Sequence, residues 1–135
     1  MKVLFVAGIA PIVPDLAAAR ALYVDGIGLP LSDDDYPATF ELEGVRHFGL
    51  WPLAEAARAC FGTASWPQDV PIPQASIEFE VADVAAAAAE LEARGHRLLH
   101  PARVEPWGQT VARLLSPEGL VVGLSWAPWY HVKEA

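Results

Sequence analysis

The chain has 135 residues, of which 53% are hydrophobic and 19% are charged, and its formal net charge is −8. This composition is that of a globular domain and excludes an intrinsically disordered chain. No basic stripe exists that could neutralise phosphates, so the charge argues against a nucleic-acid partner. The single cysteine, Cys60, excludes an intrachain disulfide and fits a reducing, cytoplasmic compartment.

The first elements that the sequence predicts are a strand over residues 2–13 and a helix that follows Asp15. The strand segment is rich in Val, Ile and Phe. It is too short to span a bilayer and is interrupted by glycine and proline, so we expect no membrane partner. Asp15 precedes apolar residues at helical spacing and is expected to be the N-cap, while Gly26 and Gly28 end the helix.

Three further strands are expected before the middle of the chain, at residues 29–31, 38–42 and 43–51. The segment 52–73 is predicted to be a connector, with a short helix at 53–60 followed by a loop that several prolines break.

The segment 74–129 repeats the order of elements found in residues 1–51. Apolar residues alternate with Glu78 and Glu80, which is typical of a half-buried strand. Asp83 then precedes an alanine-rich helix that ends at Gly95. Strands are expected at 97–99, 110–115 and 118–126, and residues 130–135 form a tail. The sequence therefore predicts one α+β domain, in which two βαβββ modules form a cup-shaped mixed sheet with helices outside.

Three segments carry a resemblance to a known family: DLAAARALYVDGIGLPL, IEFEVADVAAAAAELEARGH and PWGQTVARLLSPEGLVVGLSW. Together with the duplicated layout, they resemble the vicinal oxygen chelate superfamily. That superfamily includes glyoxalase I, extradiol dioxygenases, and the fosfomycin- and bleomycin-resistance proteins. Trp107 and Gly108 stand where the family has a Trp-Gly pair, and Ser116 stands where it usually has Asp. The resemblance covers nearly the whole chain and implies the fold, but this fold carries unrelated chemistries.

The resemblance also implies where a divalent metal would be held, by side chains on the first and last strands of each half. These positions fall at Gly8, Phe48, Ser76 and Gly123. Glycine offers no side chain, phenylalanine has no donor atom, and serine is rarely a metal ligand. We therefore expect no metal, no cofactor and no catalytic residue.

Strand alternation assigns other side chains to the concave face of the predicted cup. Ser76, Glu78 and Glu80 are expected to project into it from one strand. On the strand at 43–51, the same parity turns Arg46 and Phe48 inward and His47 outward. Trp107 belongs to an element that lies beside the pocket in the family. The predicted ligand-binding residues are therefore Arg46, Phe48, Ser76, Glu78, Glu80 and Trp107.

The leading hypothesis is a metal-free small-molecule-binding protein of the glyoxalase/bleomycin-resistance type. Its acidic charge and its tryptophans favour a cationic or aromatic ligand, held without conversion. In the alternative interpretation, the two carboxylates are solvated, or paired with Arg46 or Arg113. We also expect a cytoplasmic homodimer.

Two alternatives stay open. In one, the protein is a lyase-, isomerase- or dioxygenase-like enzyme whose metal ligands occupy unusual positions and include His47, Glu78 or Glu80. In the other, it is a structural or interaction module whose cup is filled by its own side chains, such as Phe48, Trp51 and the tail pair Trp129-Tyr130.

Overall fold

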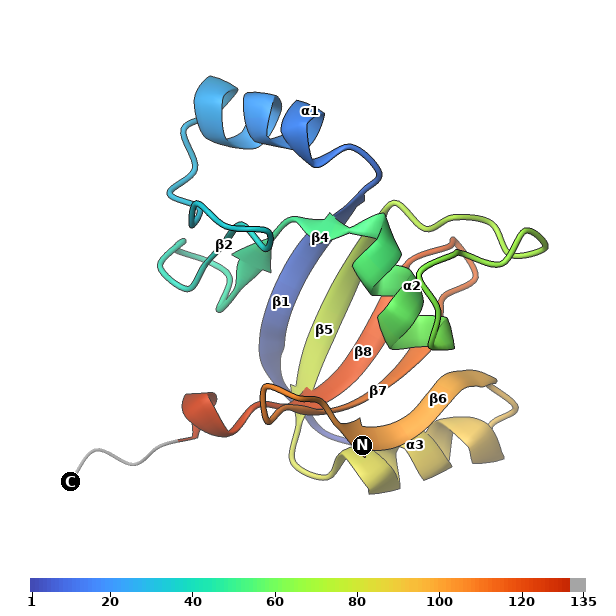
Figure 1. Ribbon diagram of the computed structural model, residues 1–135. Coiled ribbons are helices and arrows are strands. Elements are labelled where there is room, and N and C mark those ends of the chain that lie inside the picture. Colours follow the sequence, from blue (N-terminus) through green and yellow to red (C-terminus); the bar gives the residue numbers. More distant parts are fainter. Residues whose placement is uncertain (132–135) are drawn as a thin grey trace.

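The computed structural model describes residues 1–131 and contains a curved mixed sheet of eight strands (Figure 1). The strand order is β2-β3-β1-β5-β8-β7-β6, and β4 pairs with β1. The strands are β1 (Val3–Val13), β2 (Ala38–Thr39), β3 (Phe48–Gly49), β4 (Trp51–Pro52), β5 (Ala75–Val81), β6 (Leu98–Val104), β7 (Thr110–Leu115) and β8 (Val121–Trp126). The helices are α1 (Leu16–Arg20), continued by the π-helical turn η1 (Ala21–Gly26), α2 (Leu53–Phe61), α3 (Val84–Ala93) and the 3-10 turn η2 (Pro128–Tyr130). The predicted α+β fold class, a cup-shaped mixed sheet with helices, is confirmed.

The predicted capping residues begin two of the helices. The Oδ1 atoms of Asp15 and Asp83 each accept a hydrogen bond 3.0 Å long, from the backbone N–H of Ala18 and of Ala86. These bonds satisfy backbone donors that the first turn of a helix leaves free. The strand predicted at 110–115 is β7, and the connector helix predicted at 53–60 is α2, one residue longer.

Helices pack on both faces of the sheet. On the outer face, α3 contributes Val84, Ala87 and Ala88 to a core with Ala112 of β7 and Leu124 of β8. On the other face, α2 packs at one end of the cup, where its residues Ala56 and Cys60 meet Ile12 of β1 and Val121 of β8. Figure 1 shows α3 beneath the curved strands and α2 in front of them. The inner face is therefore closed at the end where α2 lies.

The first half of the chain departs from the prediction. Residues 29–31 form no strand, and the strand expected at 38–42 shrinks to β2. Pro30 has no N–H to donate to a ladder. The backbone of Ser32 and Asp34 is instead held by the Arg20 guanidinium. The expected strand at 43–51 is interrupted as well and leaves only the short strands β3 and β4, both parallel to β1.

The helical segment α1–η1 stands apart from the sheet at the top of Figure 1. None of its residues is buried. The face of β1 opposite the cup is correspondingly bare, and Val3, Val6 and Ile9 are exposed there. Within residues 1–131, no helix combines the length and the apolar character needed to cross a membrane. Of the predicted tail 130–135, residues 132–135 lie outside the described part of the chain.

Candidate ligand-binding site

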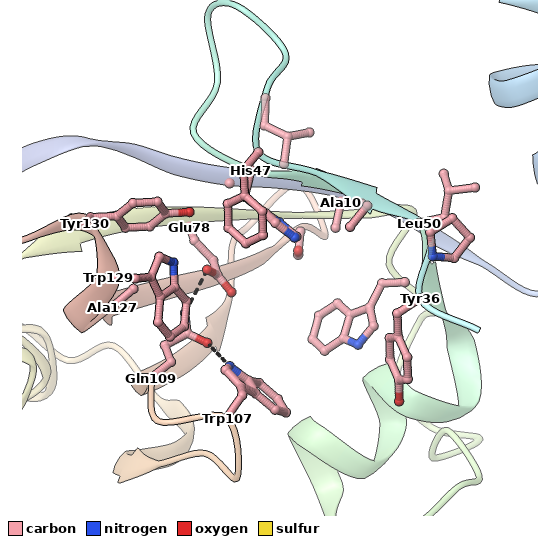
Figure 2. Close-up of a pocket in the computed structure, with 18 of the residues that line it drawn as sticks. Ala10, Tyr36, His47, Leu50, Glu78, Trp107, Gln109, Ala127, Trp129 and Tyr130 are labelled. Carbon is pink, nitrogen blue, oxygen red and sulfur yellow. Dashed lines mark hydrogen bonds between the residues drawn. The ribbon is translucent and has the colours of Figure 1, made fainter. Parts of the chain in front are cut away.

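A cavity of about 560 Å³ lies on the inner face of the sheet. Its walls come from β1, from the segments around β2 to β4, from β5 and β7, and from the chain after β8. Aromatic rings surround much of it, among them Tyr36, Trp51, Trp129 and Tyr130 (Figure 2). A volume of this size suits a small organic molecule.

A row of directly opposed residues crosses the sheet at the cavity. Gly8 of β1 is opposite Glu78 of β5, which is opposite Gly123 of β8; Gly123 is opposite Arg113 of β7. His100 of β6 continues the row beyond Arg113. Opposed residues on neighbouring strands project from the same face of a sheet. Glu78 and Arg113 therefore lie on the inner face, in one row with Gly8 and Gly123.

Gly123 leaves room for the side chain of Glu78. A Cβ atom at position 123 would lie 3.0 Å from the Cγ atom of Glu78, tighter than nine in ten real Cβ contacts. The glutamate therefore lies across the strand next to its own and does not stand upright in the cavity. A larger residue at position 123 would require the Glu78 side chain to move.

Glu78 ends a chain of hydrogen bonds that starts at the cavity mouth. The indole Nε1 of Trp107 donates to Oε1 of Gln109 at 2.8 Å (Figure 2). The amide Nε2 of Gln109 donates in turn to Oε2 of Glu78 at 2.9 Å and to Oγ of Ser125 at 2.7 Å. Burial raises the pKa of Glu78, and the Arg113 charge and the Gln109 hydrogen bond offset this only in part. The site thus holds a carboxyl group whose charged form is disfavoured.

His47 also lines the cavity. Its ring packs against Phe40, with 4.8 Å between the ring centroids. A Cβ atom at position 49 would lie only 3.1 Å from its Cε1, so Gly49 gives the imidazole its space, whereas a Cβ atom at position 8 would make an ordinary contact, 3.7 Å from its Nδ1. Burial lowers the pKa of His47 and favours the neutral ring.

Arg113 is the charged group of the cavity floor on β7 and is only 2% exposed. Its Nη1 donates to Oε1 of Glu105 at 2.7 Å and to Nε2 of His100 at 3.2 Å. His100 can accept because its Nδ1 faces the Pro101 carbonyl at 2.7 Å and therefore carries the proton. Burial alone would raise the pKa of Glu105, but Arg113 and Arg103 outweigh it and lower that pKa.

The chain after β8 closes the cavity on the side away from α2. Trp129 and Tyr130 line it. This segment is fastened by Glu80, a fully buried residue whose Oε2 accepts from the backbone N–H of Ala127 and faces Nε2 of His131, both at 2.7 Å. The His131 ring stacks on Trp126, with ring centroids 3.4 Å apart.

Three of the predicted site residues line the cavity: Ser76, Glu78 and Trp107. The other three, Arg46, Phe48 and Glu80, lie elsewhere. The Arg46 guanidinium lies 4.3 Å from the centre of the Phe5 ring. Glu80 shares the face of Glu78 but is covered by the chain after β8.

The predicted orientations of Phe48 and His47 are wrong. Phe48 is opposite Ile9, whose neighbour on β5 is Ile77, so the register turns Phe48 to the outer face. There its ring meets Tyr23, with centroids 6.0 Å apart. His47 consequently points inward. The prediction fails because the register of β3 on β1, with Phe48 opposite Ile9, decides which alternate residues face inward, and this register could not be read from the sequence.

Sequence reasoning did not place Gln109 and Arg113 in the site. A signal existed for Arg113, because it is the single charged residue in the strand 110–115 and a buried charge requires partners. Gln109 directly follows the Trp-Gly pair that was recognised. For Tyr36, no local signal existed, since its position depends on the irregular loop before β2.

The residues at the family's metal positions do not fit a metal ion. Gly8 and Gly123 offer no side chain, and Phe48 faces outward. The unusual set His47, Glu78 and Glu80 does not converge either, because Glu80 is bound to the chain after β8. Across residues 1–131 there is no group of three or more His, Cys, Asp or Glu side chains arranged to hold a metal.

Comparison with known proteins agrees with the fold. The solved structures that resemble it include methylmalonyl-CoA epimerase from Mycobacterium tuberculosis, with a TM-score of 0.61 and 15% identity over 96% of this chain and 93% of that one. A glyoxalase/bleomycin resistance protein/dioxygenase superfamily member from Vibrio splendidus 12B01 has a TM-score of 0.56 and 15% identity, over 89% of this chain and 96% of that one. Methylmalonyl-CoA epimerase from Streptomyces coelicolor has a TM-score of 0.56 and 19% identity, over 92% of this chain and 94% of that one.

A search of curated proteins found no match. The sequence profile described as "Glyoxalase/Bleomycin resistance protein/Dioxygenase superfamily" matches residues 7–124, which is most of the chain. The chain belongs to the glyoxalase/bleomycin resistance protein/dioxygenase superfamily.

Proposed function

We propose that this protein binds a small molecule with an aromatic body in the cavity on the inner face of its sheet and holds it without a metal ion. The observation that carries the proposal is the cavity itself, about 560 Å³ in volume, with aromatic walls and few polar groups. Flat ligands stack favourably on such walls, and apolar surface removed from water drives binding.

Glu78 is the residue that we propose binds a polar group of the ligand. It is held by Gln109 and can accept a hydrogen bond from an amine or a hydroxyl group of the ligand. A bound cation would favour the charged carboxylate and offset part of the cost of its burial. A cationic ligand is therefore compatible with the site, although the site does not require one.

Binding without conversion is part of the same proposal. The residues at the family's metal positions carry no suitable donor set, which supports a site that works through shape and hydrogen bonds. The similar epimerase structures are named for methylmalonyl-CoA and for 2-nitronate-propionyl-CoA as bound molecules. At 15–19% identity, that ligand chemistry is not carried over to this chain.

We also propose that two copies of the chain associate. Exposed apolar residues of β1 and the uncovered segment α1–η1 support this proposal, because each copy could cover the bare face of the other. A cytoplasmic location remains part of the proposal and rests on the single, buried cysteine.

The binding proposal is tested by calorimetric titration with three naphthalene probes: neutral naphthylacetamide, cationic naphthylethylamine and anionic naphthylacetate. The variant Ala10→Phe fills the cavity from β1 without removing a polar group. We expect at least one probe to bind the wild type, and every bound probe to lose affinity at least tenfold in Ala10→Phe.

The matched control is Val104→Phe, which adds a ring at an exposed residue of β6 that does not line the cavity. It is expected to bind as the wild type does. Binding of none of the probes to the wild type, or equal binding by Ala10→Phe, would overturn the proposed function.

A further inference from the structure

The guanidinium of Arg113 offers hydrogen-bond donors that the protein does not use. Both of its bonds, to Glu105 and to His100, are made by the same atom, Nη1. Among the described residues, no hydrogen bond engages Nε or Nη2. An arginine that is 2% exposed normally has its donors satisfied, since an unpaired buried donor is costly.

The free edge of this guanidinium borders the cavity. Within residues 1–131, the only fully enclosed side-chain nitrogen or oxygen atom without a partner is Oε1 of Glu80. Nε and Nη2 of Arg113 are therefore not sealed inside the protein, and the space that Arg113 lines is the cavity. The guanidinium also lies 5.4 Å from the centre of the Trp51 ring, another cavity wall. The Nε–Nη2 edge of arginine is a fork that matches the two oxygens of a carboxylate.

The charges around Arg113 favour an anion at this edge. The local cluster consists of Arg113 and Arg103, with Glu105 as the shared carboxylate partner. Glu78 lies on the other side of Gly123 in the same row, yet it forms no ion pair with Arg113. Because burial disfavours the charged form of Glu78, Glu105 is the one carboxylate paired with the two guanidinium groups, and a carboxylate from a ligand would balance the second positive charge.

The position of Arg113 is fixed before any ligand arrives. Glu105 and His100 hold Nη1 from β6 and the turn after it, and β7 is paired on both sides. A guanidinium held in this way loses little side-chain entropy on binding.

We propose that Arg113 is a carboxylate subsite of the cavity, so that the ligand of this protein is an aromatic compound bearing a carboxylate. Its two oxygens accept hydrogen bonds from Nε and Nη2 of Arg113, and its aromatic body lies against Trp51 and the other rings of the cavity. A hydroxyl or amino group near the carboxylate would reach Glu78 across Gly123. The proposal rests on the proposed function, because the subsite lies inside that cavity.

The test compares naphthylacetate with naphthylacetamide, two probes of nearly the same shape that differ in charge. Calorimetry on the wild type is expected to give a dissociation constant about tenfold lower for the acid, because charge-assisted hydrogen bonds are roughly twice as strong as neutral ones. In the double variant Arg113→Met/Glu105→Gln, this difference is expected to vanish, because the acid loses the charge-assisted bonds and the amide only the weaker neutral ones. Removing both partners avoids leaving a buried charge unpaired.

The matched control is Arg103→Met. Arg103 pairs with the same glutamate but does not line the cavity, so the preference for the acid is expected to persist. If the double variant does not fold, Arg113→Lys keeps a cation for Glu105 but lacks the fork, and the preference is expected to fall at least threefold.

The outcomes separate the two proposals. Binding of the amide or the amine together with no preference for the acid overturns the carboxylate subsite and leaves the proposed function standing. A preference that survives in the Arg113 variants, or that disappears equally in Arg103→Met, also overturns the subsite. Binding of no probe overturns both.

Discussion

Glu78 is held in the middle of the sheet by one hydrogen bond from Gln109, and the protein around it disfavours its charge. A group whose pKa is raised in the folded state binds its proton more tightly there than in the unfolded chain. The stability of the fold therefore declines as the pH rises from the ordinary pKa of 4.5 towards the raised value, and it stays lower above that value.

The variant Glu78→Gln tests this cost directly. Glutamine keeps an oxygen that can accept from Gln109, and it cannot ionise. We expect a higher free energy of unfolding at neutral pH, by about 1 kcal/mol, the usual size of a stabilising substitution. Urea unfolding over a pH series should show the gain appearing as the pH rises above 4.5.

The control for this variant is Glu92→Gln, on the exposed face of α3, where no such gain is expected. A Glu78→Gln variant that is less stable than the wild type at every pH would contradict the account. So would a gain that is equally large below the ordinary pKa.

At the residue scale, the sequence predicted the positions of some side chains and not of others. Ser76 and Glu78 were correctly placed on the inner face because β5 is long and regular, so alternation holds. The faces of Phe48 and His47 were exchanged because the short strand β3 gives no sequence signal for its register on β1. Arg113 belongs to a regular strand, but the orientation of its free edge depends on Glu105, which lies outside that strand.

Among the elements, the packing of α1–η1 against the sheet is the part of the fold that the sequence described least well, although β1 itself was predicted within one residue. Asp15 caps the helix as predicted, yet the helix does not cover the sheet as α3 does. Local capping signals specify where a helix begins and contain no information about the surface against which it packs. The strand predicted at 29–31 does not form, and the backbone of the loop at 29–37 is held by side chains. Arg20 donates a hydrogen bond to the Ser32 carbonyl, and the Ser32 hydroxyl accepts one from the backbone N–H of Ala38.

The bare outer face of β1 provides the element-scale prediction. If each copy of the chain covers this face of the other copy, Val6→Glu should lower the molar mass measured by light scattering from that of a dimer to that of a monomer. Val6 is 38% exposed, so a charge there costs the single chain little.

Val104→Glu serves as the control, because Val104 is 71% exposed at the edge of β6, away from this face. Its mass should remain that of a dimer. A wild-type chain that is monomeric would contradict the proposed association, as would a dimer that Val6→Glu does not weaken.

For the whole molecule, the cavity depends on contacts between segments far apart in the chain. The connector helix α2 closes one end of the cup, and the chain after β8 closes another through Glu80 and His131. The duplicated strand and helix pattern predicted the curved sheet, and the family shares it. It could not predict these closures, because neither segment belongs to the repeated pattern.

The five tryptophans offer one measurement that tests the central claim, that this cavity is the ligand site. Trp51, Trp107 and Trp129 line the cavity. Trp66 donates its Nε1 hydrogen to Val70 and packs near α2, and Trp126 stacks on His131. Each indole N–H gives its own resonance in a nitrogen–proton correlation spectrum.

On titration with naphthylacetate, the resonances of the three cavity tryptophans are expected to shift, with saturation at the affinity that calorimetry gives. The resonances of Trp66 and Trp126 are expected to stay in place. Shifts as large at Trp66 or Trp126 as at the three cavity residues, or no shift of those three at saturation, would contradict the assignment of this cavity as the binding site.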